Sequence, residues 1–363
     1  MPADTTTLPA PSIAAQLAAF AHGLTPDMLP AAVVEQAKLL MLDALGIALA
    51  SSQHDFAHCA YRGLHALGGA GDSAVMGAFA PLPLRDAVLM NGILVHGLDF
   101  DDTHPGAITH PSASAFPLAL GLAAQRHASG AEMIMTYVLA IEVAARLGAA
   151  AQGRFHDVGF HPTGLVGAFG CALAAGKLMG LDQAGLEHAQ GVVLSMASGS
   201  MEFLSDGAWT KRMHSGWAGV SGLTATALAG AGFRGPSQPY EGRFGLYASH
   251  LAARGLNADL SLCARGLGER WELMDVAVKL YPATSRTPAS MPRWRCARPV
   301  CALTRSLRYR CCCRKGCTRW CASRWRPSGD RPTSMNRSSA FTIWSRWPCC
   351  AASWGWPNWM PPT

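Results

Sequence analysis

The chain has 363 residues, half of them hydrophobic, and a formal net charge of +7. That charge is uneven, because 15 of the 30 Lys and Arg but one of the 23 acids lie after residue 283, which leaves the first 283 residues acidic. The three Cys of this acidic part argue against a disulfide framework and favour a reducing compartment.

The first residues lack the basic and then apolar pattern of a signal peptide. Apolar segments such as LLMLDALGIALA are too short, or too interrupted by polar groups, to cross a bilayer. We therefore expect a cytoplasmic protein with no membrane partner.

Most of the acidic part has the periodicity of α-helices, with apolar residues three or four positions apart. Thr25-Pro26-Asp27 has the composition of a cap before a short helix. Glycine is frequent inside the helical segments, which predicts closely packed helices. The predicted helices cover residues 13–22, 31–50, 84–98, 114–127, 130–149, 163–180, 184–197 and 216–232.

No alternation of strands and helices and no glycine-rich phosphate loop occur before residue 270. The predicted fold class is therefore mainly all-α, with one large helical domain over residues 1–267. Residues 268–283 are predicted to begin a second region.

Residues 284–363 have a different composition, with nine of the 12 Cys and eight of the 11 Trp. Clustered Arg with interleaved aromatic residues is typical of a nucleic-acid-binding arm. Dense Cys suggests a zinc module, although Cys311, Cys312, Cys313, Cys317 and Cys321 do not form two clean CxxC pairs.

A third interpretation is that this tail is translated out of frame. GC-rich codons misread by one base give Arg, Ala, Pro, Cys and Trp, which is the composition of the tail. Back-translation with GC-favouring codons and a shift of frame gives FTHACIDAALAL at the junction and KRRPTNEHEPQFSVHYLVA later. These strings have ordinary composition and helical patterning, so we favour this interpretation and expect no native fold after residue 283.

The densest group of polar side chains lies in HGLDFDDTHPGAITHPS, residues 96–112. Two X-Pro steps after an apolar helix predict a loop, which can place carboxylates and imidazoles together for proton transfer. The alternatives are a solvated turn or a metal site, and no HxH or HxxxH spacing supports a metal. The polar residues are His96, Asp99, Asp101, Asp102, Thr103, His104, Thr109 and His110.

Two further segments carry candidate groups. His161-Pro162 directly precedes a predicted helix, whose N-terminus would favour a bound anion. Lys211, Arg212 and His214 lie between small-residue segments, where a cation suits a carboxylate substrate. A structural histidine and a solvated Lys-Arg pair are the alternatives.

Taken in order, these segments resemble the MmgE/PrpD family of 2-methylcitrate dehydratases and cis-aconitate decarboxylases. The matching strings are LLMLDALGIALA, NGILVHGLDFDDTHPGAITHPS, GFHPTGLVG and WTKRMHSGWAG. The two re-framed strings also look like later segments of that family. The resemblance covers residues 10–283.

The resemblance implies a large helical domain and a smaller α/β lid, with the active site between them and a homodimer as the usual assembly. The lid would begin at residues 268–283 and be lost or scrambled in the tail, so we expect little or no activity. The family acts on di- and tricarboxylates without a metal or organic cofactor. A polycarboxylate is thus the expected partner, and nucleic acid is not.

Motif by motif, the resemblance points to Asp99, Thr103, His110, His161 and Lys211. We assign Asp99, His161 and Lys211 to catalysis, and Thr103, His110 and also His104 to substrate binding. We expect Asp99 or His161 to serve as base or acid, Lys211 and His110 to hold carboxylates, and Thr103 to orient them. A further family His would fall near Thr287, but the chain as written lacks it.

The predicted reaction is proton abstraction next to a carboxylate followed by loss of a β-substituent, with 2-methylcitrate dehydration as the first candidate. The alternatives are decarboxylation of cis-aconitate and epimerisation of an amino-dicarboxylate. An inactive, frameshifted product or a basic binding protein is the alternative outside enzymes.

Overall fold

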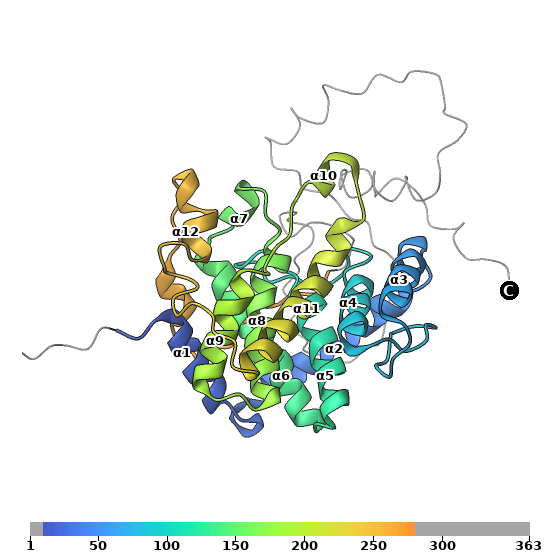
Figure 1. The fold of residues 1–363 in the computed structure, drawn as a ribbon, viewed down its shortest axis with the longest axis horizontal. Helices are drawn as coiled ribbons and strands as arrows, with labels where there is room; N and C mark the ends of the chain where they lie inside the picture. Colours follow the sequence, from blue (N-terminus) through green and yellow to red (C-terminus); the bar gives the residue numbers. More distant parts are fainter. Residues whose placement is uncertain (1–9, 280–363) are drawn as a thin grey trace, which may run out of the picture. The chain divides into compact units, whose positions relative to one another are not determined.

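The computed structural model describes residues 10–279, and these residues fold into α-helices joined by loops and short 3-10 turns (Figure 1). The twelve helices of this part are α1 Ile13–Gly23, α2 Ala31–Ser51, α3 Asp55–Gly68, α4 Leu84–Val95, α5 Ser112–Arg126, α6 Gly130–Ala150, α7 Arg154–Asp157, α8 Pro162–Met179, α9 Gln183–Leu194, α10 Phe203–Asp206, α11 Thr210–Gly230 and α12 Leu246–His250. The 3-10 turns are Pro26–Met28, Ala252–Arg254, Leu260–Cys263 and Glu272–Asp275.

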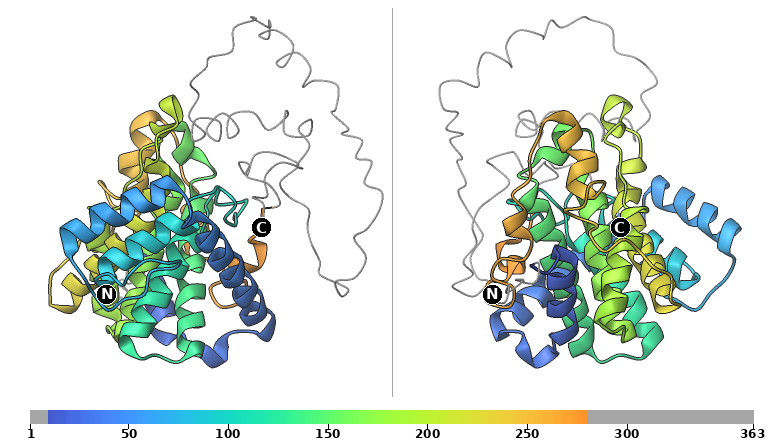
Figure 2. Two further views of the ribbon diagram at one scale, coloured as in Figure 1. Left: turned by 90° about the vertical axis from the view of Figure 1, so that its right-hand side faces the viewer. Right: turned by 60° about the vertical axis from the view of Figure 1, so that its left-hand side comes forward.

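The all-α prediction is confirmed, since between residues 10 and 279 only isolated β-bridges occur. Most predicted helices agree with the structure to within about three residues at each end. Helix α11 differs more, since it begins at Thr210 rather than at residue 216, and the helices α3, α7, α10 and α12 were not predicted. Helix α3 lies at the edge of the fold, and most of its side chains are exposed (Figures 1 and 2), whereas α7, α10 and α12 have only four or five residues each.

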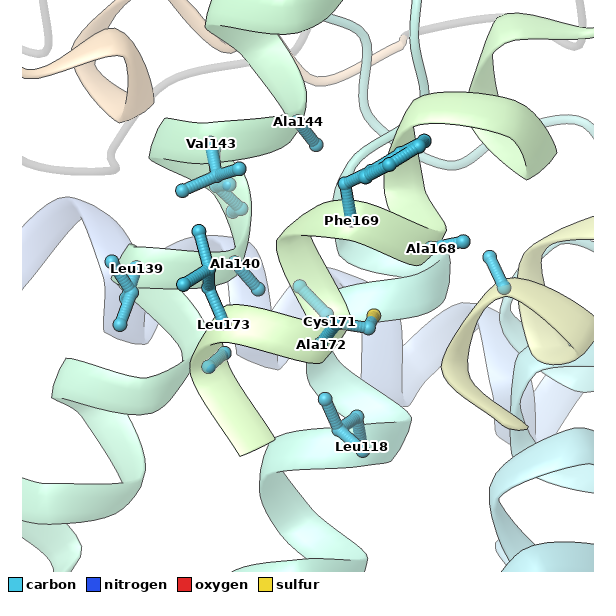
Figure 3. Packing of buried hydrophobic residues seen from close by; sticks show 14 of the residues in the cluster. Leu118, Leu139, Ala140, Val143, Ala144, Ala168, Phe169, Cys171, Ala172 and Leu173 are labelled. Carbon is cyan, nitrogen blue, oxygen red and sulfur yellow. The ribbon is translucent and has the colours of Figure 1, made fainter. Parts of the chain in front are cut away.

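Helices α5, α6 and α8 form the centre of the core (Figure 3). Leu118, Leu139, Phe169 and Leu173 are fully buried there, and Cys171 lies among them as a free, buried thiol. Helices α6 and α8 are long and apolar enough to cross a membrane by length and composition, but 83% of each apolar window is buried inside the fold. Such burial is typical of core helices.

Small residues allow α4 and α11 to cross at backbone contact, as the glycine content predicts. A Cβ on Gly92 would lie 2.3 Å from Gly216 Cα, and a Cβ on Gly216 would lie 2.3 Å from the Leu89 carbonyl oxygen. Ser215 Oγ donates to the Gly92 carbonyl at 3.1 Å. This crossing brings the loop after α4 beside the first turn of α11, where the candidate residues lie.

Two buried charges on α6 anchor the last described segment. Arg146, 2% exposed, donates to the carbonyl oxygens of Arg265, Gly266 and Arg270. Glu142 accepts from the Leu273 amide at 3.0 Å. Residues 268–279 therefore pack against the helical domain, while the predicted lid and the tail 284–363 lie outside the described residues and stay predictions.

The α4–α11 crossing generates the first prediction. Gly216→Ala should lower the free energy of unfolding by about 1–3 kcal/mol, because the new methyl group meets the Leu89 carbonyl and the helices must separate. Thermal and urea unfolding followed by circular dichroism at 222 nm would measure the change.

The matched control is Gly46→Ala in the exposed middle of α2, where an added Cβ meets nothing within 4 Å. That change should stabilise the chain by roughly 0.5–1 kcal/mol through helix propensity. Equal changes in the free energy of unfolding for the two substitutions would show that the close packing at Gly216 does not contribute to stability.

Candidate active site

The loop between α4 and α5 holds most of the candidate side chains in fixed positions. Its tip closes on itself, since the His104 amide donates to the Thr109 carbonyl at 2.9 Å. Its base caps α5, where the Ser112 amide donates to Asp102 Oδ1 at 3.2 Å. At its start Asp99 has φ = 60°, a left-handed conformation that Asp tolerates better than most residues but that still costs free energy.

Asp99 pairs with two lysines that come from distant parts of the chain. Its Oδ1 lies 2.6 Å from Lys211 Nζ and 3.1 Å from Lys279 Nζ. Burial by itself raises the pKa of Asp99, but the two ammonium groups outweigh it and hold that pKa well below the usual range. Asp99 is therefore an ionised carboxylate.

Lys211 is in the first turn of α11, where the helix dipole disfavours a cation. Arg212 follows it, donates to the Gly97 carbonyl at 2.8 Å and stacks over the Phe56 ring at 4.7 Å. The Asp99 carboxylate compensates for this concentration of positive charge. The early start of α11 therefore places two cations at the end of the Asp99 loop.

A second carboxylate, Asp101, supports His96. His96 Nδ1 lies 2.5 Å from Asp101 Oδ2. Burial raises the pKa of Asp101, but His96, His110 and Lys279 outweigh it and lower the pKa below its ordinary value. An ionised Asp101 can only accept, so His96 Nδ1 carries a hydrogen, and its buried Nε2 has no hydrogen-bond partner among residues 10–279.

His110 is held in one tautomer. Its Nδ1 lies 2.8 Å from the Asp102 carbonyl oxygen, which can only accept, and 3.1 Å from Thr103 Oγ1. Burial, followed by the charge of Lys279, lowers the pKa of His110 to about 3. His110 is therefore a neutral imidazole whose Nε2 lone pair is available to accept a proton or a hydrogen bond.

His161 and His214 form an imidazole pair. His161 is the N-cap residue of α8, as predicted, and its Nδ1 lies 3.2 Å from the Nδ1 of His214 on α11. Burial, followed by nearby His96, lowers the pKa of His161 well below its ordinary value and that of His214 to about 4. Because one neutral ring donates to the other, one Nε2 of the pair carries a hydrogen and the other does not.

The four imidazoles form one cluster. The ring centre of His96 lies 5.2 Å from that of His110 and 5.4 Å from that of His161, and His161 lies 5.4 Å from His214. A groove of about 480 Å³ reaches the cluster beside His214, between residues 198–208 and the start of α11. The arrangement can move protons between neutral groups next to a pair of cations.

Behind the cluster, Asp102 belongs to a buried network with the opposite electrostatics. Both its oxygens contact Ser112, whose hydroxyl also lies 2.5 Å from the Tyr137 hydroxyl. Burial, followed by repulsion from Asp101 and partly offset by the Ser112 bonds, raises the pKa of Asp102 to about 7. Within four residues, Asp99 and Asp101 are thus ionised beside cations, whereas the pKa of Asp102, which has no cation beside it in the described part of the chain, is raised.

His104 does not join the imidazole cluster. Its Nδ1 accepts from the Ala107 amide at 3.0 Å, so its Nε2 carries the hydrogen that points to Glu272 Oε2 at 3.1 Å. His104, Glu272 and Asp275 are close enough to hold a metal ion, but the protonated Nε2 cannot coordinate one and Arg270 pairs with both acids. These side chains instead connect the loop to the segment before Lys279.

The structure therefore brings together five of the six residues predicted for catalysis or substrate binding: Asp99, Thr103, His110, His161 and Lys211. Their roles stay predictions. Three neighbours, His96, Asp101 and His214, lay in the candidate segments but received no role, and a fourth, Lys279, was not singled out. An isolated Lys in the apolar run VAVKLYP was a usable signal, because such a lysine needs a buried partner.

Comparison with known proteins identifies the family to which the chain is similar. The model of the MmgE/PrpD N-terminal domain matches residues 15–259. The chain is 31% identical over 283 residues to cis-aconitate decarboxylase of Homo sapiens, 29% over 284 residues to that of Mus musculus and 26% over 279 residues to that of Aspergillus terreus.

These matches cover 74% or 75% of the chain and 56% of each relative. The chain therefore spans about half the length of the curated relatives it matches.

The Asp102 network generates a prediction about pH. A carboxyl group whose pKa is higher in the folded state than in the unfolded chain binds its proton more tightly when folded. Its contribution to stability is complete below about pH 4 and is lost as the pH rises through about 7. Asp102→Asn does not titrate, can accept from the Ser112 amide through its Oδ1 and can donate from its Nδ2 to the Ser112 hydroxyl. The variant should therefore gain stability relative to wild type as the pH rises from 4.5 to 7.5.

Urea unfolding at four pH values in that range would measure this difference. Comparing the two proteins at each pH cancels the contributions of the other titrating groups. A stability difference that stays constant with pH would mean that Asp102 titrates near its ordinary value.

Proposed function

The chain belongs to the MmgE/PrpD family, and we propose that it is a lyase acting on a tricarboxylate. The observation that carries the proposal is the contact between Asp99 and Lys211 beside four neutral or paired imidazoles. Lys211 Nζ is a partly exposed cation of the site and can exchange its contact with Asp99 for a ligand carboxylate. The polycarboxylate substrates expected from the sequence need such a cation.

The finer proposal is decarboxylation of cis-aconitate, since three relatives that share the site region are named for that reaction. In this reaction the bond from carbon to one carboxylate breaks, and CO₂ leaves. Its electron pair spreads over the adjacent double bond and a remaining carboxylate, which Lys211 would stabilise. A proton then adds to carbon from an imidazole N–H.

Dehydration of a hydroxy-tricarboxylate such as 2-methylcitrate is the second candidate, because the same groups can run it. An imidazole lone pair removes a C–H proton next to a carboxylate, and the electron pair expels the β-hydroxyl group as water after that group gains a proton. The available lone pair of His110 Nε2 favours this first step.

Proton donation favours histidine over Asp99, because lowered pKa values make both Asp99 and His110 weak bases and only the imidazoles carry a hydrogen. An Asp99 carboxylate held by two ammonium groups is a weak base and has no proton to give. His161, whose pKa is also low, is neutral and shares a hydrogen with His214. We propose that His110 or the His161–His214 pair moves the proton and that Asp99 holds Lys211 in position. A cytoplasmic homodimer remains part of the proposal.

Turnover is tested on purified full-length chain by measuring CO₂ release from cis-aconitate, dehydration of 2-methylcitrate and racemisation of an amino-dicarboxylate. The out-of-frame interpretation of the tail predicts little turnover, so the product of the gene with one base restored at the junction is assayed in parallel. CO₂ release by the restored protein would support the decarboxylase, and activity on none of the three would reject the lyase proposal.

Ligand binding gives a test that does not require turnover. Lys211→Met should weaken binding of cis-aconitate to the full chain about tenfold or more, because a charge-assisted hydrogen bond of roughly 1.5–3 kcal/mol is lost. Isothermal titration calorimetry would measure the affinities.

Lys38→Met is the control for binding, since Lys38 is exposed and forms its ion pair with Glu35, on the same helix and outside the site. It should leave the affinity unchanged. Equal affinities of wild type and Lys211→Met would remove Lys211 from the binding site.

A further inference from the structure

Lys279 is a buried cation that the motifs of the site do not include. Its side chain is 2% exposed, and lysine is almost never so buried without a partner. Its Nζ lies 3.1 Å from Asp99 Oδ1, 3.0 Å from the Asp99 carbonyl oxygen and 3.8 Å from Asp101 Oδ1. One ammonium group thus contacts both ionised carboxylates of the loop and its main chain.

The loop itself holds the segment that carries Lys279. Thr103 and Ala277 exchange two backbone hydrogen bonds, of 2.8 and 2.9 Å. One residue further along the loop, His104 contacts Glu272 at 3.1 Å. These contacts fix the chain two residues before Lys279. The main chain therefore holds Lys279 next to the loop, a support that an exposed lysine on a free segment would lack.

The two lysines on Asp99 are not equivalent. Lys211 is 20% exposed and contacts a side-chain oxygen only, so it can turn to another anion at small cost. Lys279 also donates to the Asp99 carbonyl, and that residue has the unfavourable φ of 60°. Moving Lys279 would remove this bond to the Asp99 main chain. It would also remove a buried positive charge from beside the carboxylates of Asp99 and Asp101.

We propose that Lys279 is a positioning residue of the site: it fixes Asp99 in its left-handed conformation and supplies a permanent positive charge behind the loop. Lys211 is then free to bind a substrate carboxylate. The role of Lys279 rests on the geometry of the unliganded site, and only the identity of the ligand rests on the proposed function.

The charge of Lys279 can be tested without any substrate. The groups near it are Asp99, Asp101 and His110 on the loop, His96 at the end of α4, and Lys211 on α11. Lys279 lowers the pKa of His110, so removing its charge should move the His110 titration upward by about one pH unit. The full-length chain with ¹³C-labelled histidine would show this by NMR between pH 2.5 and 8.

The test compares Lys279→Met and Lys279→Gln with the control Lys177→Met. Lys177 also donates to a main-chain carbonyl, that of His22 at 2.6 Å, but away from the site. Gln keeps a donor for the Asp99 carbonyl without the charge, so it tests the charge even where Met prevents folding. An upward shift in both Lys279 variants and none in Lys177→Met is expected; an unchanged His110 titration in Lys279→Gln would overturn the proposal.

Binding of cis-aconitate to the same variants separates this inference from the proposed function. Lys279→Gln should bind the ligand at least about tenfold more weakly than Lys177→Met does, because the charge of Lys279 is lost and Lys211 alone must then neutralise Asp99. A shifted His110 titration with no ligand binding by any variant or by wild type would reject the tricarboxylate and leave the positioning role intact.

Discussion

The contact of one carboxylate with two ammonium groups connects the separate parts of this molecule. Asp99 follows α4, Lys211 starts α11, and Lys279 comes from the last described segment. Helix α4, which precedes Asp99, and helix α11, which carries Lys211 in its first turn, approach to backbone distance at Gly92 and Gly216. Helix packing and site geometry therefore depend on each other. A methyl group at the crossing would move α4 away from α11, and with them Asp99 away from Lys211.

The sequence predicts much of this arrangement, for identifiable reasons. Apolar periodicity located most helices, and the motifs around Asp99, His110, His161 and Lys211 named residues that the fold does bring together. Local pattern cannot report pairs that are distant along the chain. Lys279 meets Asp99 from 180 residues away, and His214 meets His161 from 53.

His104 illustrates the opposite limit. It lies in the same motif as its neighbours and was expected to bind substrate, yet both of its ring nitrogens are used in contacts with Ala107 and Glu272. Sequence spacing places a residue on a loop but does not give the direction of its side chain. The backbone of this loop is left-handed at Asp99 and Ile108, and no periodicity of the sequence predicts such a conformation.

The buried charges of α6 have a consequence for the order of folding. Arg146 and Glu142 contact each other at 3.4 Å, but their further partners lie in residues 265–273, up to 131 positions later in the chain. Until that segment leaves the ribosome, the core would contain a guanidinium and a carboxylate with unsatisfied groups, which is costly in a low-dielectric interior. The central helix of the domain is thus among the last to be completed. Contacts of such long range slow folding, and we expect the nascent chain to wait in a partly packed state that exposes apolar surface to chaperones.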